Sequence, residues 1–316
     1  MNVFVTGATG FVGRQLCARL TALGHQVTGV GRGDCDLTVA GALEARPHPS
    51  YQHIYHLAAW TQAGDFCLRH PAEQWEINQK INTHVLSWWM AGQRQAKLIS
   101  IGSSCCYDPS LPLSEDQYLR GTPEASLLTY ALTKRMLHAG LLAAGRQYGL
   151  RHLTVVPSTL YGPGYPLSTG KQLHFIYDLV RKILRGQRFG EPVVLWGDGE
   201  QRRELVYVDD FVEALIGLAN AVDDELVNVG AGQDHSIREF AAAICAQTGF
   251  PAEQIQYDGT AYVGVRTRHL RAANTIRSSI RPAASLSNMA SWESASSHLS
   301  GADSFPCCVI AQKTWS

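Results

Sequence analysis

A tyrosine and a lysine four residues apart offer the clearest chemistry in the sequence. Tyr130 and Lys134 lie within an apolar pattern, from about 126 to 148, that is typical of a helix, where residues at this spacing share one face. A free phenol has a pKa near ~10, and an adjacent ammonium favours the phenolate and lowers that pKa. The pair therefore predicts a group that passes a proton to or from a carbonyl or an alcohol near neutral pH.

A second set of reactive side chains follows the strand predicted at 97–101. Ser103 and Cys105 come directly after this strand, and in an open parallel sheet ligands bind beyond the carboxyl ends of the strands. We expect the Ser103 hydroxyl to hydrogen bond a substrate carbonyl beside Tyr130. Cys105 is either a thiol acid or base or a small buried residue.

Glycines between the first predicted strand, 2–5, and the first predicted helix indicate a dinucleotide site. They let the backbone turn tightly and let a pyrophosphate approach the helix N-terminus, where unpaired amides favour an anion. The strand, turn and helix context makes this interpretation stronger than the glycines alone. The residues of this turn expected at the cofactor are Gly7, Thr9, Gly10, Phe11, Val12 and Gly13.

The next two predicted strands refine the choice of cofactor. Strand 26–30 is followed by Arg32 rather than by the acidic residue that an NAD enzyme usually places there. A guanidinium can pair with the extra phosphate of NADP, although a solvated loop arginine is the alternative. Other expected cofactor contacts are Asp36 and Leu37 at the adenine, and Leu57, Ala58 and Ala59 at the end of strand 53–59.

The remaining patterns predict an α/β protein, with a Rossmann-type doubly wound parallel sheet and a smaller C-terminal substrate-binding lobe. We assign 1–160 to the NADP-binding domain, with about 205–230 returning to it, and 161–204 with 231–270 to the lobe. Trp88 and Trp89 are interpreted as core or dimer packing. The further elements expected are helices at 78–94, 173–185 and 236–247 and strands at 151–157, 192–196 and 227–230.

Composition excludes several classes of function. The 316 residues carry a formal net charge of zero, with 45% hydrophobic and 17% charged residues, so no global basic field favours nucleic acid or an anionic membrane. No apolar run approaches the ~18 residues of a membrane span, and the cysteines show no spacing typical of a metal site. A strand at the very N-terminus leaves no room for a signal peptide, and we expect a cytoplasmic protein. The segment 271–316 is serine-rich and atypical, and we expect it to be disordered or foreign sequence.

Taken together, these elements resemble the extended short-chain dehydrogenase/reductases, the NAD-dependent epimerase/dehydratase family. The resemblance covers about residues 1–270 and is nearest to the GDP-L-fucose synthase branch. The features that carry it at the family level are 6–13, 56–59, Asn78, Ser103, Tyr130 with Lys134, and 157–163. Those that carry it at the branch level are 102–107, Pro112, Glu115, 119–124, His174, 194–199, Arg203 with Glu204, 208–210 and 228–232.

The resemblance implies an NADPH-dependent epimerase/reductase of a GDP-4-keto-6-deoxy sugar, with NAD as the alternative cofactor and a homodimer as the assembly. Tyr130 would donate a proton, Lys134 would lower its pKa and hold the nicotinamide ribose, and Ser103 would fix the carbonyl. Cys105 and His174 would be the epimerising base and acid. Other implied contacts are Pro157 for the cofactor and Thr159, Lys182, Trp196, Arg203 and Arg268 for the substrate.

Three departures from the branch pattern leave alternatives open. Thr159 stands in place of Asn, Arg268 in place of Lys, and Arg271 in place of Asp. The second interpretation is another enzyme of the same fold, namely a plain 4-keto reductase, a 4-epimerase or a dehydratase. A dehydratase, however, would need an acidic residue after Ser103. A non-catalytic NADP-binding protein is the third, although such proteins commonly lose the Tyr and Lys pair.

Overall fold

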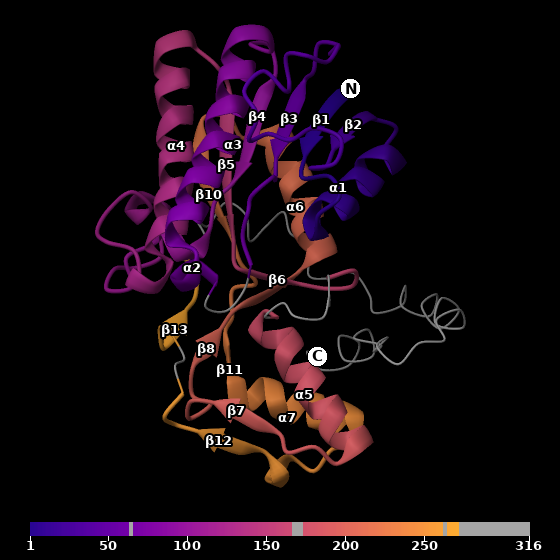
Figure 1. Ribbon diagram of the computed structural model, residues 1–316, viewed down its shortest axis with the longest axis vertical. Helices are drawn as coiled ribbons and strands as arrows, with labels where there is room; N and C mark the ends of the chain where they lie inside the picture. The colour runs from indigo at the N-terminus through magenta and orange to yellow at the C-terminus, as the bar shows by residue number, and fades with distance from the viewer. Residues whose placement is uncertain (63–65, 166–172, 262–263, 272–316) are drawn as a thin grey trace.

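The computed structural model describes residues 1–62, 66–165, 173–261 and 264–271 (Figure 1). The predicted tail after Arg271 therefore lies outside the described residues. A six-stranded sheet forms the upper part of the molecule in Figure 1, in the order β10-β5-β4-β3-β1-β2, and all of its adjacent strands are parallel. Its strands are β1 Asn2–Thr6, β2 Gln26–Val30, β3 His53–His56, β4 Lys97–Ile101, β5 His152–Pro157 and β10 Glu225–Val229.

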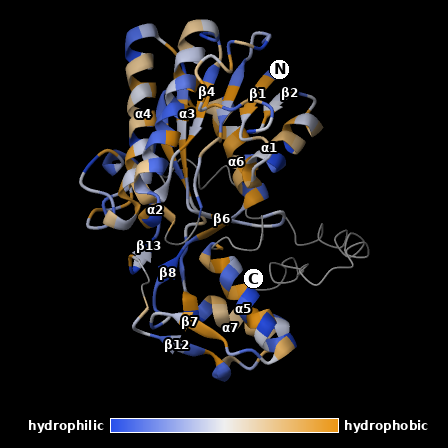
Figure 2. Cartoon of the chain, viewed as in Figure 1, coloured by the Kyte–Doolittle hydropathy of each residue, from blue (hydrophilic) through white to orange (hydrophobic). Residues whose placement is uncertain are grey.

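Helices cover both faces of this sheet, which explains why its central strands are almost continuously buried. On one face, α1 (Phe11–Ala22) and α6 (Val208–Ala221) pack on one core cluster. On the other face lie α3 (Pro71–Gly92) and α4 (Leu128–Tyr148), with the short α2 (Phe66–Arg69) beside them. Figure 2 shows hydrophobic residues concentrated along the central strands. The doubly wound parallel sheet predicted from the sequence is confirmed.

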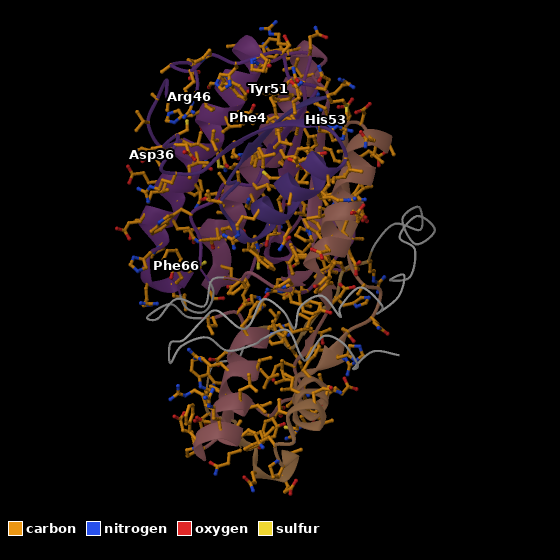
Figure 3. The ribbon with its side chains drawn as sticks, turned by 90° about the vertical axis from the view of Figure 1, so that its right-hand side faces the viewer. Phe4, Asp36, Arg46, Tyr51, His53 and Phe66 are labelled. Carbon is orange, nitrogen blue, oxygen red and sulfur yellow. The ribbon has the colours of Figure 1, made fainter. Side chains whose placement is uncertain are left out.

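The tryptophans of α3 are core residues of this chain. Trp88 and Trp89 are buried, and the Trp89 indole donates a hydrogen bond to the Ala96 carbonyl over 2.9 Å. The Phe4 ring on β1 lies 5.0 Å from the Trp88 ring and 5.2 Å from the Tyr51 ring, between the centroids. Figure 3 shows Phe4 and Tyr51 together within the helix-covered upper part of the molecule.

The lower lobe packs two helices against short strand ladders. Its helices are α5 (Phe175–Phe189) and α7 (Ile237–Thr248), which share one apolar core. A capping box formed by Ser236 and Glu239 fixes the start of α7. The ladders are β7 (Val194–Trp196) with β12 (Gln256–Asp258), and β8 (Arg202–Arg203) between β11 (His235–Ser236) and β13 (Thr267–Arg268). β6 (Thr159–Tyr161) pairs with β9 (Leu205–Tyr207).

Several element boundaries differ from those predicted. The helix expected from 78 begins at Pro71, because proline occupies a first-turn position and Glu73 follows in the same turn. The helix expected at 173–185 runs to Phe189 and ends at Gly190, which adopts the left-handed conformation at φ +67°. Short 3-10 turns absent from the prediction are Ser104–Cys106, Glu115–Gln117, Ala125–Leu127 and Ala252–Gln254.

Buried histidines make the stability of this fold depend on pH. His56 contacts Thr6 Oγ1 over 2.8 Å and Asn82 Oδ1 over 3.1 Å, and His138 contacts Thr154 Oγ1 over 2.9 Å. Burial lowers the pKa of each imidazole from its ordinary 6.5 to about 4. The folded protein therefore binds fewer protons than the unfolded chain below pH 6.5, so acid favours unfolding.

We predict that the free energy of unfolding, measured by urea titration, is constant just above pH 6.5 and falls between pH 6.5 and 4. Each such histidine contributes a slope of at most about 1.4 kcal/mol per pH unit. His138→Gln removes one titrating group and should flatten the profile, whereas His70→Gln changes a half-buried histidine that contacts Glu73 and should not. A profile that stays level down to pH 4 would contradict this account.

Candidate active site

The glycine-rich turn has the backbone that a dinucleotide needs. Gly7 adopts φ +67°, and a Cβ there would lie 2.8 Å from the Ala58 amide nitrogen. A Cβ on Gly13 would lie 2.1 Å from the Gly7 carbonyl oxygen. Gly10 caps α1 without a side-chain hydrogen bond, and the first turn carries no acidic residue. The N-terminal amides of Phe11, Val12 and Gly13 therefore suit a pyrophosphate.

The end of β3 lies beside the glycine-rich turn, since Leu57 and Ala58 are the nearest neighbours of Gly7. The Thr6 hydroxyl accepts a hydrogen bond from the Ala58 amide over 3.2 Å, which joins the predicted Leu57–Ala59 contacts to β1. The Asn78 side chain accepts from the Trp60 amide and donates to the Trp60 carbonyl, both over 2.9 Å. Asn78 thereby fixes the chain as it leaves β3 and passes the cofactor site.

Arg32 follows the end of β2, where the sequence predicts a contact with the extra phosphate of NADP. Its side chain is 76% exposed, and its Nε lies 3.7 Å from an Asp36 carboxylate oxygen. Hydrogen bonds from Thr38, with a smaller contribution from Arg32, hold the pKa of Asp36 below its ordinary value. The Asp34 carboxylate accepts from the Gly31 amide over 2.9 Å, so this acidic side chain supports the turn.

The predicted proton-donating pair lies on α4, facing the turn after β4. The Lys134 ammonium lies 6.0 Å from the Tyr130 ring centroid and is 6% exposed, and burial lowers its pKa to about 8. Burial also raises the pKa of Tyr130, the thiols nearby raise it further, and a hydrogen bond with Ser103 acts in the opposite direction. The expected net lowering of the Tyr130 pKa by Lys134 is thus outweighed by burial in the free protein. Tyr130 keeps its proton at neutral pH, as a proton donor must.

Cys105 follows Ser103 in the short turn at Ser104–Cys106. The Ser103 hydroxyl accepts a hydrogen bond from the Cys105 amide over 3.2 Å. The Cys105 sulfur accepts one from Arg268 Nη1, also over 3.2 Å. The adjacent Cys106 differs, because it is fully buried. Its sulfur accepts a hydrogen bond from the Tyr118 hydroxyl over 3.1 Å, and burial raises its pKa to about 12. Of these two neighbouring thiols, Cys105 is the one placed to react.

His174 occupies the N-cap position of α5 and lies near Arg268, the arginine that contacts Cys105. Its Nδ1 is buried and has no hydrogen-bond partner among the described residues. Burial lowers the pKa of His174 to about 4, and the guanidinium groups of Arg268 and Arg203 act in the same direction. The imidazole is therefore neutral at pH 7 in the free protein, so it must gain a proton before it can act as the predicted acid.

The predicted substrate contacts fall into two groups. Arg203 and Arg268 lie near His174, and Arg203 donates to the Arg202 carbonyl over 2.7 Å. In the lobe, the Lys182 ammonium lies 5.6 Å from the Trp196 ring centroid, and Trp196 is 56% exposed. An exposed indole of this kind can stack on a nucleotide base. Thr159 donates its amide to the Glu204 carbonyl over 3.3 Å and follows Pro157 by two residues.

Two acidic residues at this site had no predicted role. Glu124 pairs with Arg268 over 3.0 Å. Glu204 is buried, and its carboxylate accepts from the amides of Gly232 over 2.8 Å and Leu270 over 3.0 Å. The sequence places Glu204 beside Arg203, but no local pattern indicates that its carboxylate is buried.

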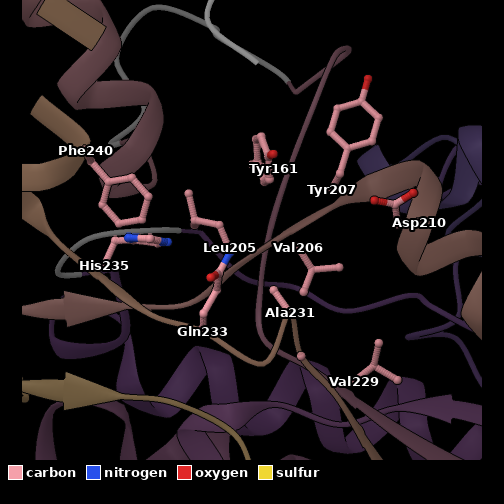
Figure 4. A pocket seen from close by; sticks show the side chains of 11 residues that line it. Tyr161, Leu205, Val206, Tyr207, Asp210, Val229, Ala231, Gln233, His235 and Phe240 are labelled. Atoms are coloured by element: carbon pink, nitrogen blue, oxygen red, sulfur yellow. The ribbon is translucent and has the colours of Figure 1, made fainter. Parts of the chain in front are cut away.

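A separate pocket of about 200 Å³ lies where β9 meets α6 and the chain after β10 (Figure 4). It contains none of the predicted site residues. Among the side chains that line it are Tyr161, Tyr207 and Asp210, and burial raises the pKa of Asp210. The catalytic candidates lie instead around the end of β4.

Comparison with known proteins agrees with this geometry. A family model described as the NAD dependent epimerase/dehydratase family matches residues 3–230, and the chain belongs to that family. Its relatives place it among the nucleotide-sugar reductases and epimerases. Within the described part of the chain, no helix has both the length and the apolar character to span a membrane.

Three individual matches illustrate the range of relatives. GDP-L-fucose synthase 1 of Arabidopsis thaliana is 29% identical, over 79% of this chain and 78% of its own. The dTDP-4-dehydro-6-deoxy-D-allose reductase of Streptomyces bikiniensis is 28% identical, over 85% and 87%. A solved GDP-L-fucose synthetase from Naegleria fowleri bound to NADP has a TM-score of 0.73 and 24% identity, with 87% of each chain covered.

We predict that Tyr130→Phe slows NADPH-dependent reduction of a nucleotide 4-keto sugar by at least about a hundredfold, because the ring is kept and the proton donor is lost. NADPH affinity, measured by fluorescence titration, should change little. Tyr148→Phe, at the exposed end of the same helix, is the matched control. A Tyr130→Phe rate close to that of the unaltered protein would exclude Tyr130 as the donor.

Proposed function

We propose that the protein is an NADPH-dependent epimerase/reductase of a GDP-4-keto-6-deoxy sugar. The observation that carries this proposal is the grouping of two kinds of reactive side chain around the end of β4. Ser103 and Tyr130 can bind and protonate a carbonyl oxygen. Cys105, two residues after Ser103, adds a partly exposed thiol that a plain ketone reductase does not need.

The reductive step uses the hydroxyl pair. NADPH, when bound against the glycine-rich turn, supplies the hydride that reduces carbon 4. The Ser103 hydroxyl hydrogen bonds the carbonyl oxygen, and Tyr130 transfers its proton to that oxygen as negative charge develops there. Lys134 donates hydrogen bonds at the nicotinamide ribose and stabilises the resulting phenolate.

The epimerising step uses the thiol and the imidazole. A ketone at carbon 4 acidifies the protons on carbons 3 and 5. The Cys105 thiolate takes such a proton, so an S–H bond forms while the C–H electrons move into an enolate whose oxygen faces Ser103 and Tyr130. His174 returns a proton to the opposite face of the ring and inverts that centre. The negative diphosphate of the substrate, near Arg203 and Arg268, favours the imidazolium that this return requires.

Known relatives support the GDP and NADP parts of the proposal. The Arabidopsis relative is named a GDP-L-fucose synthase, and the Naegleria structure is described as a GDP-L-fucose synthetase bound to NADP. In this chain, Arg32 is exposed beside the expected position of the adenine ribose. Trp196 and Lys182 would contact the nucleotide in the lobe.

One other function has a specific observation in its favour. The Streptomyces relative is described as a reductase of a dTDP sugar, and a plain 4-keto reductase needs only Ser103, Tyr130 and Lys134. A dehydratase lacks support, because Ser104 and Cys105 follow Ser103 where an acidic residue would be wanted. A non-catalytic NADP-binding protein has no use for the proton-donating pair that this chain keeps.

A homodimer through α3 and α4 is part of the proposal. The large apolar side chains exposed on α4 are Met136, Leu142 and Tyr148. Both helices already cover one face of the sheet (Figure 1), so their outer sides are available to a second copy. Sedimentation equilibrium would show the assembly directly.

We predict that Arg32→Ala raises the KM for NADPH by about tenfold and leaves the KM for NADH nearly unchanged, because only NADPH carries the phosphate that a guanidinium would bind. Steady-state kinetics with both cofactors measures this. Arg19→Ala, an exposed arginine on α1 paired with Glu213, serves as the control. An equal effect on both cofactors would show that Arg32 does not read the phosphate.

We predict that incubation with GDP-4-keto-6-deoxymannose and NADPH in deuterated water places deuterium on carbons 3 and 5 of the product, measured by NMR. Cys105→Ser should slow this exchange at least about a hundredfold. Tyr130→Phe should slow net NADPH oxidation at least about a hundredfold while exchange continues. NADPH loss without deuterium in the unaltered protein would leave a simple reductase and refute epimerisation. Cys106→Ala, which removes the adjacent buried thiol, is the matched control.

A further inference from the structure

A buried arginine on α4 lies next to the proton-donating pair. Arg135 directly follows Lys134 and is only 8% exposed. Its Nε donates to the Cys106 carbonyl over 2.8 Å, its Nη1 to the Gly121 carbonyl over 2.8 Å, and its Nη2 to the Arg120 carbonyl over 2.7 Å. Each nitrogen of the guanidinium is therefore bonded to backbone outside the helix. The fixed fork of an arginine can hold several carbonyls at once, whereas a lysine ammonium is a single point charge.

The three carbonyls lie at the two ends of one long loop between β4 and α4. Cys106 stands where the loop begins, and Arg120 and Gly121 stand where it returns. Asp108 strengthens the closure, because its carboxylate accepts the Thr122 amide over 2.8 Å. Gly121 adopts φ +60°, and a Cβ there would lie 2.2 Å from the same carboxylate. The guanidinium therefore closes the loop at its base and ties both ends to α4.

The first end of this loop carries the predicted thiol base. The start of the turn after β4 is fixed by the sheet, because Gly102 donates its amide to the Val155 carbonyl over 2.8 Å. The end of the turn is fixed by the helix, through the bond from Arg135 to the Cys106 carbonyl. Cys105 directly precedes the residue that the helix holds, so its place depends more on Arg135 than on the sheet.

The other contacts at this end of the turn are made by side chains. The Cys106 sulfur donates to the Ala131 carbonyl over 3.5 Å, and a thiol is a weak donor. The Tyr107 hydroxyl donates to the Asn228 side chain on β10 over 2.6 Å. A hydrogen bond from a charged donor is stronger than one from a thiol. Arg135 therefore makes the stronger of these two links between Cys106 and the helix that carries the proton donor.

We propose that Arg135 is a positioning residue, which holds the turn after β4 against α4 and thereby sets where the Cys105 sulfur lies relative to Tyr130. This inference rests on the proposed function in one respect, namely that Cys105 takes the proton from the sugar. One helix then fixes both the proton donor and the base with respect to the sugar ring. A misplacement of about 1 Å can slow a reaction by about a hundredfold.

The test compares the thiol step with the hydride step in the full-length protein. Deuterium exchange into GDP-4-keto-6-deoxymannose in deuterated water is measured by NMR with NADP⁺ in place of NADPH, so that no reduction occurs. The hydride step is measured in reverse, as the absorbance of NADPH formed in a single turnover of NADP⁺ with GDP-L-fucose. That direction begins at the carbon 4 hydroxyl and needs no epimerisation.

We predict that Arg135→Lys slows deuterium exchange by about tenfold and the hydride step by less than about threefold, because the sheet still holds the start of the turn. A smaller fraction of folded protein would lower both rates by the same factor. Arg146→Lys, at an exposed position in the last turn of the same helix, is the matched control and should change neither rate. Equal effects of Arg135→Lys on both steps, or no effect on either, would overturn the inference.

A second measurement needs neither a variant nor a sugar, and it decides the question if Arg135→Lys does not fold. The Cys106 amide donates to the Ser103 carbonyl over 3.0 Å. If α4 holds this turn, that amide in the unaltered protein should exchange hydrogen within about tenfold of the rate of the α4 amides around Arg135, measured by mass spectrometry with fragmentation. Faster exchange than that would overturn the inference. Absence of deuterium exchange into the sugar, with this protection present, would count against the proposed function alone.

Discussion

The buried carboxylate of Glu204 is the interaction on which the arrangement of this site depends. It accepts the amides of Gly232 and Leu270, while the Glu204 backbone carbonyl accepts from Ser158 and Thr159. Segments far apart in the sequence therefore meet at one residue. A buried carboxylate is costly unless its oxygens are hydrogen bonded, and leaving a buried polar group without its partner typically destabilises a protein by about 1–3 kcal/mol.

This meeting point sets the positions of the cationic residues of the lobe. Arg203 precedes Glu204, and Arg268 lies two residues before Leu270. The β8 and β13 ladder aligns the two arginines directly, since Arg268 and Arg203 are register partners. The close approach of Gly230, where a Cβ would lie 2.4 Å from a Glu204 carboxylate oxygen, leaves no space for a side chain. The positively charged Arg268 side chain of the lobe therefore contacts Cys105, just beyond the end of β4.

Burial, more than pairing, decides which site groups carry protons. It raises the pKa of Tyr130 and lowers those of Lys134 and His174. A neutral phenol is the form that protonates a ketone oxygen during reduction, so the free protein is prepared for the reductive direction. His174 is neutral at pH 7 in the free protein, and the proposed function requires that binding of a diphosphate beside Arg203 and Arg268 favours its protonation.

The sequence was informative wherever the determining interactions are local. The glycine turn, the helical spacing of Tyr130 and Lys134, and the strand ends at Ser103 and Ala58 depend on near neighbours, and they predict the fold and the site region. The start of α3 at Pro71 was also marked locally, by a proline and Glu73, but the prediction began at 78. The hydrogen bond from Leu270 to Glu204, and the contacts of Arg268 with Cys105 and Glu124, join residues more than sixty positions apart. The net direction of the Tyr130 pKa shift likewise depends on burial, which local spacing does not specify.

The most direct test of the central claim is a crystal structure with NADP⁺ and a GDP-4-keto-6-deoxy sugar bound. The account predicts that the carbon 4 oxygen lies within hydrogen-bond distance of Ser103 and Tyr130, and that Cys105 and His174 face opposite sides of the sugar ring. A sugar ring that reaches Tyr130 but lies away from Cys105, or has both Cys105 and His174 on one side, would contradict it.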